Sequence, residues 1–480
     1  MLLSESLLRH RSFALDGFNL PRLEPNVSTR DQYVMNGDIW QLELARGHIY
    51  YYFPPGSSIL SLPFVTVSNA LGISAANTDG TYNPENETRI QTTLAAILMA
   101  FLAAVFYFTS RLILPQVWSV LIALAGSFGT QIWSTASRGL WSHTWAAVLT
   151  GLIVYFLVAG EVGRRKINPI LVASLLAWLY FVRPNGSIVG SAVTVYIFFF
   201  QRELSARYAL TGALWLAGFV AYSWIHFGKP LPSYYRAGRL RFDLLPVALA
   251  GNILSPSRGL FIYVPALLFV VYLLIRYRKS LPLNRLVGLS LAICALHILF
   301  ASMFANLWGD WWGGASFGAR YTTELVPWFV LLTVLGWKGR MTARDLCKPG
   351  SANRLTDERL DYTARVAATK AIPSTKSHES HEITQKTFRA GFSNTKQGAQ
   401  ARRFAYKTEI VAALLLLGLS IFINARGATS LDTWKWSQPS TDQQLRAQLW
   451  DWRHPQFLAG LQPPAPPVEF TLVQPPILID

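Results

Sequence analysis

The chain has 480 residues, of which 51% are hydrophobic and only 14% are charged, and its formal net charge is +17. Because soluble proteins carry about 25% charged residues, this composition excludes an ordinary soluble domain. In a soluble protein such a positive charge would indicate a nucleic-acid partner, but in a membrane protein it reflects orientation and contact with anionic headgroups. We therefore expect membrane lipids, and no nucleic acid, around this chain. Its two cysteines indicate no disulfide framework.

The first 91 residues are mostly polar and predict a large loop on the outer side of the membrane. The apolar segment 57–74 is short and is interrupted by Pro63, so we expect an interfacial or re-entrant helix there rather than a span. Nothing before residue 57 resembles a signal peptide or a spanning helix. We therefore expect the gene to start upstream of Met1 and to encode one further membrane helix there.

Apolar runs of roughly 17–25 residues follow this loop, and each is long enough to cross about 30 Å of hydrocarbon. We predict about ten membrane-spanning helices, at 92–114, 116–135, 142–160, 168–182, 186–200, 208–227, 259–276, 284–305, 321–337 and 408–425. The pair 168–182 and 186–200 is short, which indicates a tilted or broken helix pair. The predicted fold class is an all-α, multi-pass integral membrane protein.

The connections between these spans indicate the orientation. Short loops with clustered cations, which the positive-inside rule assigns to the cytoplasm, alternate with loops that hold single arginines. The loop 228–258 is an exception, because it carries several cations on the outer side. We divide the chain into an outer first loop (1–91), a membrane core (92–337), a basic cytoplasmic loop expected to be disordered (338–407), a last span (408–425) and an outer tail (426–480).

Single arginines stand among aromatic, glycine and proline residues at outer span ends, where the positive-inside rule does not explain them. They are Arg138, Arg183, Arg258 and Arg320. A guanidinium can grip a phosphate through two N–H groups. These arginines therefore predict a site on the outer face for an anionic, lipid-borne substrate.

Several strings along the chain resemble one protein family. Residues 51–63 (YYFPPGSSILSLP) resemble the Y-P-P-G segment in the first outer loop of bacterial GT-C glycosyltransferases. These are multi-pass enzymes that use polyprenyl-phosphate sugars, akin to family 39 and to the aminoarabinose lipid A transferases. Further strings that look like this family are 137–143 (SRGLWSH), 254–261 (LSPSRGLF), 311–321 (WWGGASFGARY) and 450–458 (WDWRHPQFL). The resemblance covers residues 4 to 461 except 338–407.

The resemblance implies a GT-C-like helical bundle in the inner (plasma) membrane, with its active site on the outer face. A sugar would pass from a polyprenyl-phosphate donor to a lipid, glycan or protein acceptor of the cell envelope by an inverting displacement. A carboxylate would take the proton of the attacking hydroxyl, and arginines would hold the phosphate leaving group. The implied donor-phosphate ligands are Arg258, Arg320, Arg138 and Arg183. The implied substrate pocket comprises Tyr52, Pro54, Pro55, Gly56, His143, Asp310, Trp311 and Trp312.

The chain departs from the family at the catalytic base. The family's Asp follows its first helix, which corresponds to a position upstream of Met1. The resemblance therefore leaves two interpretations open: an active enzyme with another carboxylate as base, or a truncated chain that is inactive. Asp38 is the first substitute, although a structural role fits it better. Phe53 stands where some relatives have Lys, which removes one phosphate ligand.

Other residues leave two interpretations open. His143 could contact donor or acceptor, or bond to backbone at a helix end. Asp310 could orient a sugar hydroxyl, bind a divalent cation or pair with an outer arginine; no cofactor is otherwise indicated. Glu324 follows Arg320 by four residues and is expected to hold that arginine. His297, alone in an apolar span, is expected to be a core residue.

Two functions other than an enzyme fit the same features: a transporter or flippase for lipid-linked sugars, and a catalytically inactive binder of the donor lipid. A transporter should show paired broken helices in two repeated halves. The sequence has one short pair and no internal repeat. The large outer loop with its Pro-Pro-Gly string also favours the glycosyltransferase.

Overall fold

The computed structural model describes residues 1–20, 42–235, 240–303, 311–314, 316–346, 396–437 and 442–463. Within them the chain is mostly helical, with one two-stranded hairpin. Helices long and apolar enough to cross a membrane are Pro84–Arg111, Ser142–Glu161, Arg202–Phe227, Asn284–Met303 and Tyr406–Thr429. The described chain therefore has the predicted all-α architecture of a membrane protein. The number of about ten spans stays a prediction, because five further apolar helices have only 10–17 residues.

The N-terminal unit precedes the bundle. It comprises α1 (Leu2–Arg9), the antiparallel strands β1 (Leu42–Ala45) and β2 (His48–Tyr51), α2 (Gly56–Leu60) and α3 (Leu62–Ala70). The turn between the strands has positive φ at both Arg46 and Gly47, as a type I′ turn requires. Segment 57–74, expected not to span, forms the two short helices α2 and α3, with Pro63 in the first turn of α3.

A buried carboxylate holds this unit together. Glu5, on α1, is fully buried. It accepts hydrogen bonds from the side chains of Asn69 and Ser74, both at 2.8 Å, and from the backbone N–H of Ala75 at 3.1 Å. Because both its oxygens are bonded, the carboxylate fixes α1 against the end of α3.

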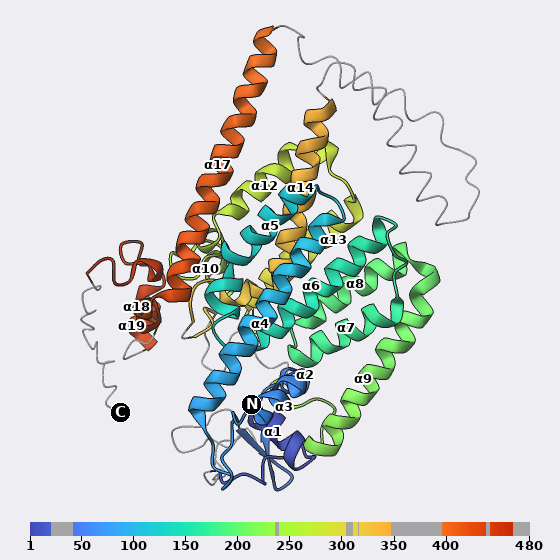
Figure 1. Cartoon of the computed structure of the whole chain (residues 1–480), viewed down its shortest axis with the longest axis vertical. Helices are drawn as coiled ribbons and strands as arrows, with labels where there is room; N and C mark the ends of the chain where they lie inside the picture. The colour runs from blue at the N-terminus through green and yellow to red at the C-terminus, as the bar shows by residue number, and fades with distance from the viewer. Residues whose placement is uncertain are drawn as a thin grey trace, which may run out of the picture.

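The first half of the bundle is built on α4. It comprises α4 (Pro84–Arg111), α5 (Gln116–Phe128), α6 (Ser142–Glu161), α7 (Pro169–Val182), α8 (Gly186–Phe200) and α9 (Ser205–Phe227). α4 packs on α5 and α6, α6 packs on α7, and α7 packs on α8 and α9. The span predicted at 116–135 is interrupted, because α5 ends at Phe128 and a π-helix, η1 (Ile132–Ala136), follows it. The N-terminal unit lies beside the start of α4, at the end of the bundle away from the last turns of α14 (Figure 1).

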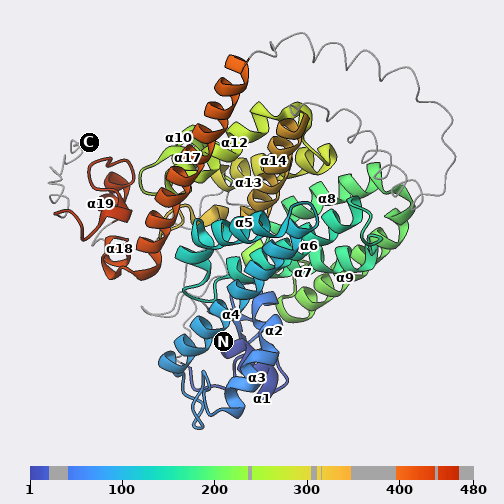
Figure 2. The ribbon, with the colours of Figure 1, turned by 45° about the horizontal axis from the view of Figure 1, so that its top comes forward.

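The second half packs around α14. It comprises α10 (Leu245–Leu254), α11 (Leu260–Tyr263), α12 (Ala266–Arg276), α13 (Asn284–Met303), the 3₁₀ helix η5 (Arg320–Leu325), α14 (Val326–Leu346) and α17 (Lys396–Thr429). α14 contacts α4, α5, α6, α12 and α13, and its Trp328 is fully buried. Three shorter elements follow: α18 (Leu431–Trp436), α19 (Asp442–Gln448) and η6 (Gln456–Leu458). Both views place α18 and α19 beside the end of α17 (Figures 1 and 2).

Two boundaries differ from the prediction. The segment 228–258, expected to be a loop, contains the apolar helix α10, which packs on α13. The span predicted at 259–276 is broken between α11 and α12 by Pro265, which has no N–H to donate to the preceding turn. Of the predicted cytoplasmic loop 338–407, the start belongs to α14 and the end to α17, and residues 347–395 lie outside the described chain.

Candidate functional site

Four elements distant in sequence bring a polar cluster together inside the bundle. Glu324, on η5, is buried and has its Oε1 2.7 Å from the Nε of Arg183, at the C-terminal end of α7. Its Oε2 lies 2.6 Å from the Nδ1 of His143, in the first turn of α6. We call Glu324, Arg183, His143, His297 and Arg320 the outer cluster, after the predicted orientation.

Glu324 therefore has a different partner from the expected one. We expected it to hold Arg320, but its ion pair is with Arg183. The reason lies in the helix type: η5 is a 3₁₀ helix, so side chains four residues apart point in directions about 120° apart. Arg183 also donates from Nη1 to the hydroxyl of Ser142 at 3.1 Å.

His297 is a core residue, as predicted, but it faces the outer cluster. It is fully buried on α13, and its Nε2 lies 2.9 Å from the carbonyl oxygen of Tyr321 and 3.5 Å from Glu324. Because a carbonyl only accepts, the Nε2 of His297 carries the proton and donates.

Arg320 lies against the other face of His143. Its Nε donates to the Nε2 of His143 at 3.3 Å, and its Nη1 donates to the carbonyl of Gly313 at 3.3 Å. The guanidinium also lies 4.4 Å from the ring centre of Trp141, which is a cation–π distance. In the part of the chain that the structure describes, the Nη2 of Arg320 has no acceptor, and the side chain is half-buried.

These bonds define the charge of the outer cluster. Because the Nε2 of His143 accepts from Arg320, its Nδ1 carries the proton and donates to Glu324, so the ring is neutral. The described members then comprise two guanidinium cations and one carboxylate. Counted over the described residues, these members carry one excess positive charge, on the side where Arg320 has a spare donor; Asp310, which could pair with an outer arginine, lies outside the described chain. An excess of positive charge attracts an anion.

Arg258 has a structural environment instead. It is almost completely buried, and its nitrogens donate to the carbonyls of Trp312 at 3.1 Å, Ser257 at 2.7 Å and Gly314 at 3.3 Å. Its Nη1 also donates to the Oε1 of Gln456 at 2.8 Å. All three nitrogens of the guanidinium are thus engaged with the protein. The prediction that Arg258 binds donor phosphate stays a prediction, and it would require these bonds to be exchanged.

Arg258 and Arg320 both donate hydrogen bonds to one tight turn in the Trp-Trp-Gly-Gly string. Arg258 donates to the carbonyls of Trp312 and Gly314, and Arg320 donates to the carbonyl of Gly313, which lies between them. The glycines have φ of 81° and 65°, a conformation that side-chain-bearing residues rarely adopt. Trp311 and Trp312 are both buried, and Trp311 packs on Gly251 of α10. Their predicted contact with sugar is therefore untested, while their packing role is clear.

The Pro-Pro-Gly string docks the N-terminal unit on α7. Tyr52, Pro54, Pro55 and Gly56, the predicted pocket residues of this loop, are all buried. A Cβ on Gly56 would lie 2.6 Å from the backbone carbonyl of Phe181 and 2.7 Å from the N of Val182, so only glycine allows this approach. Since Arg183 directly follows Val182, the Pro-Pro-Gly string helps to position one arginine of the outer cluster.

The remaining predicted residues lie apart from the outer cluster or outside the described chain. Arg138, just after the π-helix, is exposed and donates to the carbonyl of Gly427 at 2.7 Å. Asp38, the substitute base, and Asp310, the suggested cation ligand, are outside the described residues. Among the residues that are described, no three His, Cys, Asp or Glu side chains form a group that could hold a metal ion.

Gln456 is an organising residue that the sequence interpretation did not single out, although it lies in the quoted string 450–458. It is fully buried; its Oε1 accepts from Arg258 and from the N–H of Gly318 at 3.0 Å, and its Nε2 donates to the carbonyl of Ser316 at 3.1 Å.

Five residues before Gln456, the carboxylate of Asp451 accepts hydrogen bonds from the backbone N–H groups of Arg453 and His454 and so caps a turn. Partial burial would raise the pKa of Asp451, but the hydrogen bonds from His454 and from backbone N–H groups outweigh burial and lower it.

Comparison of the chain with protein-family models, curated proteins and solved structures found no match. The features that bear on its function are therefore its own residues and the geometry of the outer cluster.

Proposed function

We propose that the chain is an integral membrane glycosyltransferase that takes a sugar from a polyprenyl-phosphate donor and transfers it to an acceptor on the outer face of the cytoplasmic membrane. The observation that carries this proposal is the excess positive charge of the described members of the outer cluster. Glu324 is paired with Arg183, Arg320 reaches this carboxylate only through His143, and the guanidinium of Arg320 has a spare N–H pair and lies over Trp141. A lipid-borne phosphate supplies the missing anion.

In the proposed reaction, the bond between the anomeric carbon and the phosphate oxygen breaks while the acceptor hydroxyl oxygen bonds to the same carbon. The phosphate leaves with the bonding electron pair, and a carboxylate receives the hydroxyl proton. A phosphate leaving group needs positive charge rather than a strong acid, which is what Arg320 offers. The carboxylate base is not among the members of the outer cluster, because Glu324 is already engaged with Arg183 and His143.

Donor binding tests the proposal without depending on the base. The purified full chain in lipid nanodiscs is titrated with a panel of synthetic polyprenyl-phosphate sugars, with polyprenyl alcohol as the uncharged control. Each desolvated, charge-assisted contact is worth roughly 1.5–3 kcal/mol, so Arg320→Ala should weaken donor binding by about ten- to a hundredfold. Lysine should rescue only partly, because it loses the two-pronged geometry.

Arg278→Ala is the matched control, since this arginine is exposed between α12 and α13. Equal donor affinity for the parent chain and a well-folded Arg320→Ala variant would overturn the proposal. Release of free polyprenyl phosphate on addition of an acceptor separates the transferase from its alternatives. Movement of intact donor across a vesicle bilayer without such release would instead indicate a transporter.

A further inference from the structure

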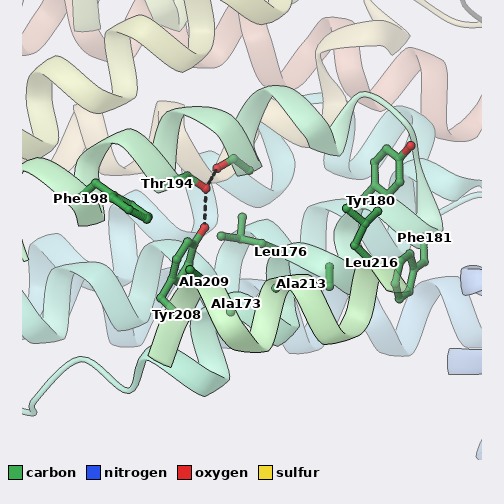
Figure 3. A pocket seen from close by; sticks show the side chains of 13 residues that line it. Ala173, Leu176, Tyr180, Phe181, Thr194, Phe198, Tyr208, Ala209, Ala213 and Leu216 are labelled. Carbon is green, nitrogen blue, oxygen red and sulfur yellow. Dashed lines mark hydrogen bonds between the residues drawn. The ribbon is translucent and has the colours of Figure 1, made fainter. Parts of the chain in front are cut away.

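A groove lies between α7, α8 and α9, and Tyr180 and Phe181 in its lining come just before Arg183 of the outer cluster. These helices border a groove of about 330 Å³, shown in Figure 3, whose lining is mostly apolar. Leu176 of α7, Phe198 of α8 and Leu216 of α9 form part of its walls. None of the members of the outer cluster lines it, so the groove is not part of the proposed transferase site.

Two glycines leave the groove open. Gly190 on α8 and Gly212 on α9 both line it, and a Cβ built on either would meet no atom within 4 Å. The hydroxyls of Thr194 and Tyr208 are bonded to each other at 2.7 Å, as Figure 3 shows, and Thr194 also lies 2.7 Å from the carbonyl of Gly190. Because these hydroxyls satisfy each other, the groove presents an apolar surface that suits a hydrocarbon chain.

The groove adjoins the side of the bundle that faces hydrocarbon. Large apolar side chains beside the groove are well exposed on α8 and α9, among them Phe199 at 66%, Leu210 at 63% and Leu214 at 66%. In a membrane protein such surfaces contact lipid tails. α7 and α8 have only 14 and 15 residues, so each is about 21–23 Å long and shorter than the hydrocarbon core of about 30 Å. Lipid tails beside them must adapt to this mismatch.

Cations gather at one end of the groove. The loop before α7 carries Arg164, Arg165 and Lys166, and the loop between α8 and α9 carries Arg202; all four are exposed. The guanidinium of Arg285 lies 4.8 Å from the ring centre of Phe200, the last residue of α8. The nearby carboxylates are Glu161 and Glu203, and the first is engaged by Tyr196 and Gln201. This excess of positive charge matches an anionic headgroup.

We propose that the groove binds an anionic phospholipid, with one acyl chain between α7, α8 and α9 and its phosphodiester among Arg202, Arg285 and Lys166. By the positive-inside rule this lipid belongs to the cytoplasmic leaflet, opposite the outer cluster. The site is distinct from the donor site, and it holds a lipid that is not consumed.

Lipid retention measured by native mass spectrometry tests the proposal on the full chain. Phosphatidylglycerol is the anionic probe, and phosphatidylcholine with the same acyl chains is its zwitterionic control. Gly212→Leu places a side chain in the groove, at a position where the new Cβ meets no atom within 4 Å. Gly218→Leu is the matched control, because Gly218 is on the same helix, is equally open at its Cβ and does not line the groove. We expect Gly212→Leu to lower phosphatidylglycerol retention at least about fivefold and Gly218→Leu to leave it unchanged.

The headgroup is tested separately. Arg202→Gln with Arg285→Gln should weaken phosphatidylglycerol binding by about fivefold for each cation removed, while Arg278→Gln with Lys279→Gln should change it little. Equal retention by the parent chain and Gly212→Leu would overturn the site, and equal retention of the two lipids by the parent chain would overturn the anionic headgroup. A dimer that dissociates in Gly212→Leu would assign the groove to a second copy. Donor binding at Arg320 should be unaffected in Gly212→Leu, so the two proposals fail independently.

Discussion

The Nε of Arg320 lies 3.3 Å from the Nε2 of His143, although the two residues are 177 positions apart in the sequence. The same imidazole has its Nδ1 2.6 Å from the carboxylate of Glu324. A neutral histidine thus links a cation that has a spare donor to a carboxylate that already has a cationic partner. This arrangement fixes the direction of the Arg320 guanidinium without cancelling its charge.

His143 should therefore act as a positioning residue for Arg320. His143→Phe removes the hydrogen bonds to the Nε of Arg320 and to the Oε2 of Glu324, and an unsatisfied buried group such as this carboxylate oxygen costs roughly 1–3 kcal/mol. We expect a lower thermal midpoint and weaker binding of the polyprenyl-phosphate donor. His143→Asn, whose amide can both donate and accept, should retain more of each property. A His143→Phe variant with unchanged donor affinity would show that the imidazole has a packing role only.

The ion pair between Arg183 and Glu324 should show strong energetic coupling. Glu324→Gln leaves the buried guanidinium without its counter-charge and is expected to destabilise the chain by about 3–5 kcal/mol. Arg183→Met removes the cation and keeps most of the side-chain volume. The double variant should lose less stability than the sum of the single losses, by roughly 0.5–3 kcal/mol, because each change removes the other's penalty. Additive losses in denaturant unfolding would contradict a direct pair.

Arg258 should contribute to stability more than to donor binding. Its replacement by alanine leaves the carbonyls of Trp312 and Gly314 and the amide oxygen of Gln456 without their shared donor, so we expect a loss of at least about 3 kcal/mol. Lysine should rescue poorly, since one ammonium cannot reach acceptors on several sides.

Thermal unfolding and donor titration on the same samples separate the two roles of Arg258. If Arg258→Lys kept full stability and lost donor affinity tenfold, the role predicted from the sequence would be correct and the structural assignment wrong. Arg320→Lys serves as the comparison, because its main effect is expected on binding.

The orientation can be tested on described, exposed positions. In a chain with Cys347→Ser, where Cys294 is buried, we introduce Asp79→Cys in the N-terminal unit or Lys279→Cys between α12 and α13. A membrane-impermeant maleimide added to intact cells should label the first variant and not the second, because cation-rich loops stay in the cytoplasm. Labelling of Lys279→Cys before permeabilisation, with Asp79→Cys protected, would reverse the orientation and remove the outer cluster from the outer face.

The helical class and most helix positions could be predicted from the sequence, because length and apolar composition are local properties. Breaks within these stretches were harder to predict: the π-helix after Phe128 satisfies its backbone within a continuous apolar run, and α10 is an apolar helix inside a segment whose cations favoured a loop. The positions of such breaks depend on tertiary packing, which overrides the local pattern.

Three of the predicted site residues lie together in the structure, and their role in donor binding stays a prediction. Arg183, His143 and Arg320 were expected at the site, and the structure brings them together. Their link through Glu324 was not predicted, because Arg183 and Glu324 are 141 residues apart and no local spacing indicates their contact. The expected pair of Arg320 with Glu324 was wrong because it assumed an α-helix where the chain forms a 3₁₀ helix. Gln456 likewise bonds to residues far away in the sequence, Arg258 at 198 positions and Gly318 at 138.

Gly56 should be essential for docking the N-terminal unit on α7. In Gly56→Ala the new methyl carbon would lie 2.6 Å from the carbonyl of Phe181, and backbone cannot move aside as a flexible side chain can. Overpacking of this kind costs typically about 1–3 kcal/mol. Because Arg183 follows Phe181 by two residues, we also expect weaker donor binding.

The matched control for Gly56→Ala is Gly218→Ala. Gly218 is a helical position with no atom within 4 Å of the new carbon, so alanine there should be neutral or stabilise the chain by up to about 1 kcal/mol. Limited proteolysis of the N-terminal unit, together with thermal unfolding, measures the effect. Equal protease resistance and equal midpoints for Gly56→Ala and the parent chain would show that this contact does not hold the unit in place.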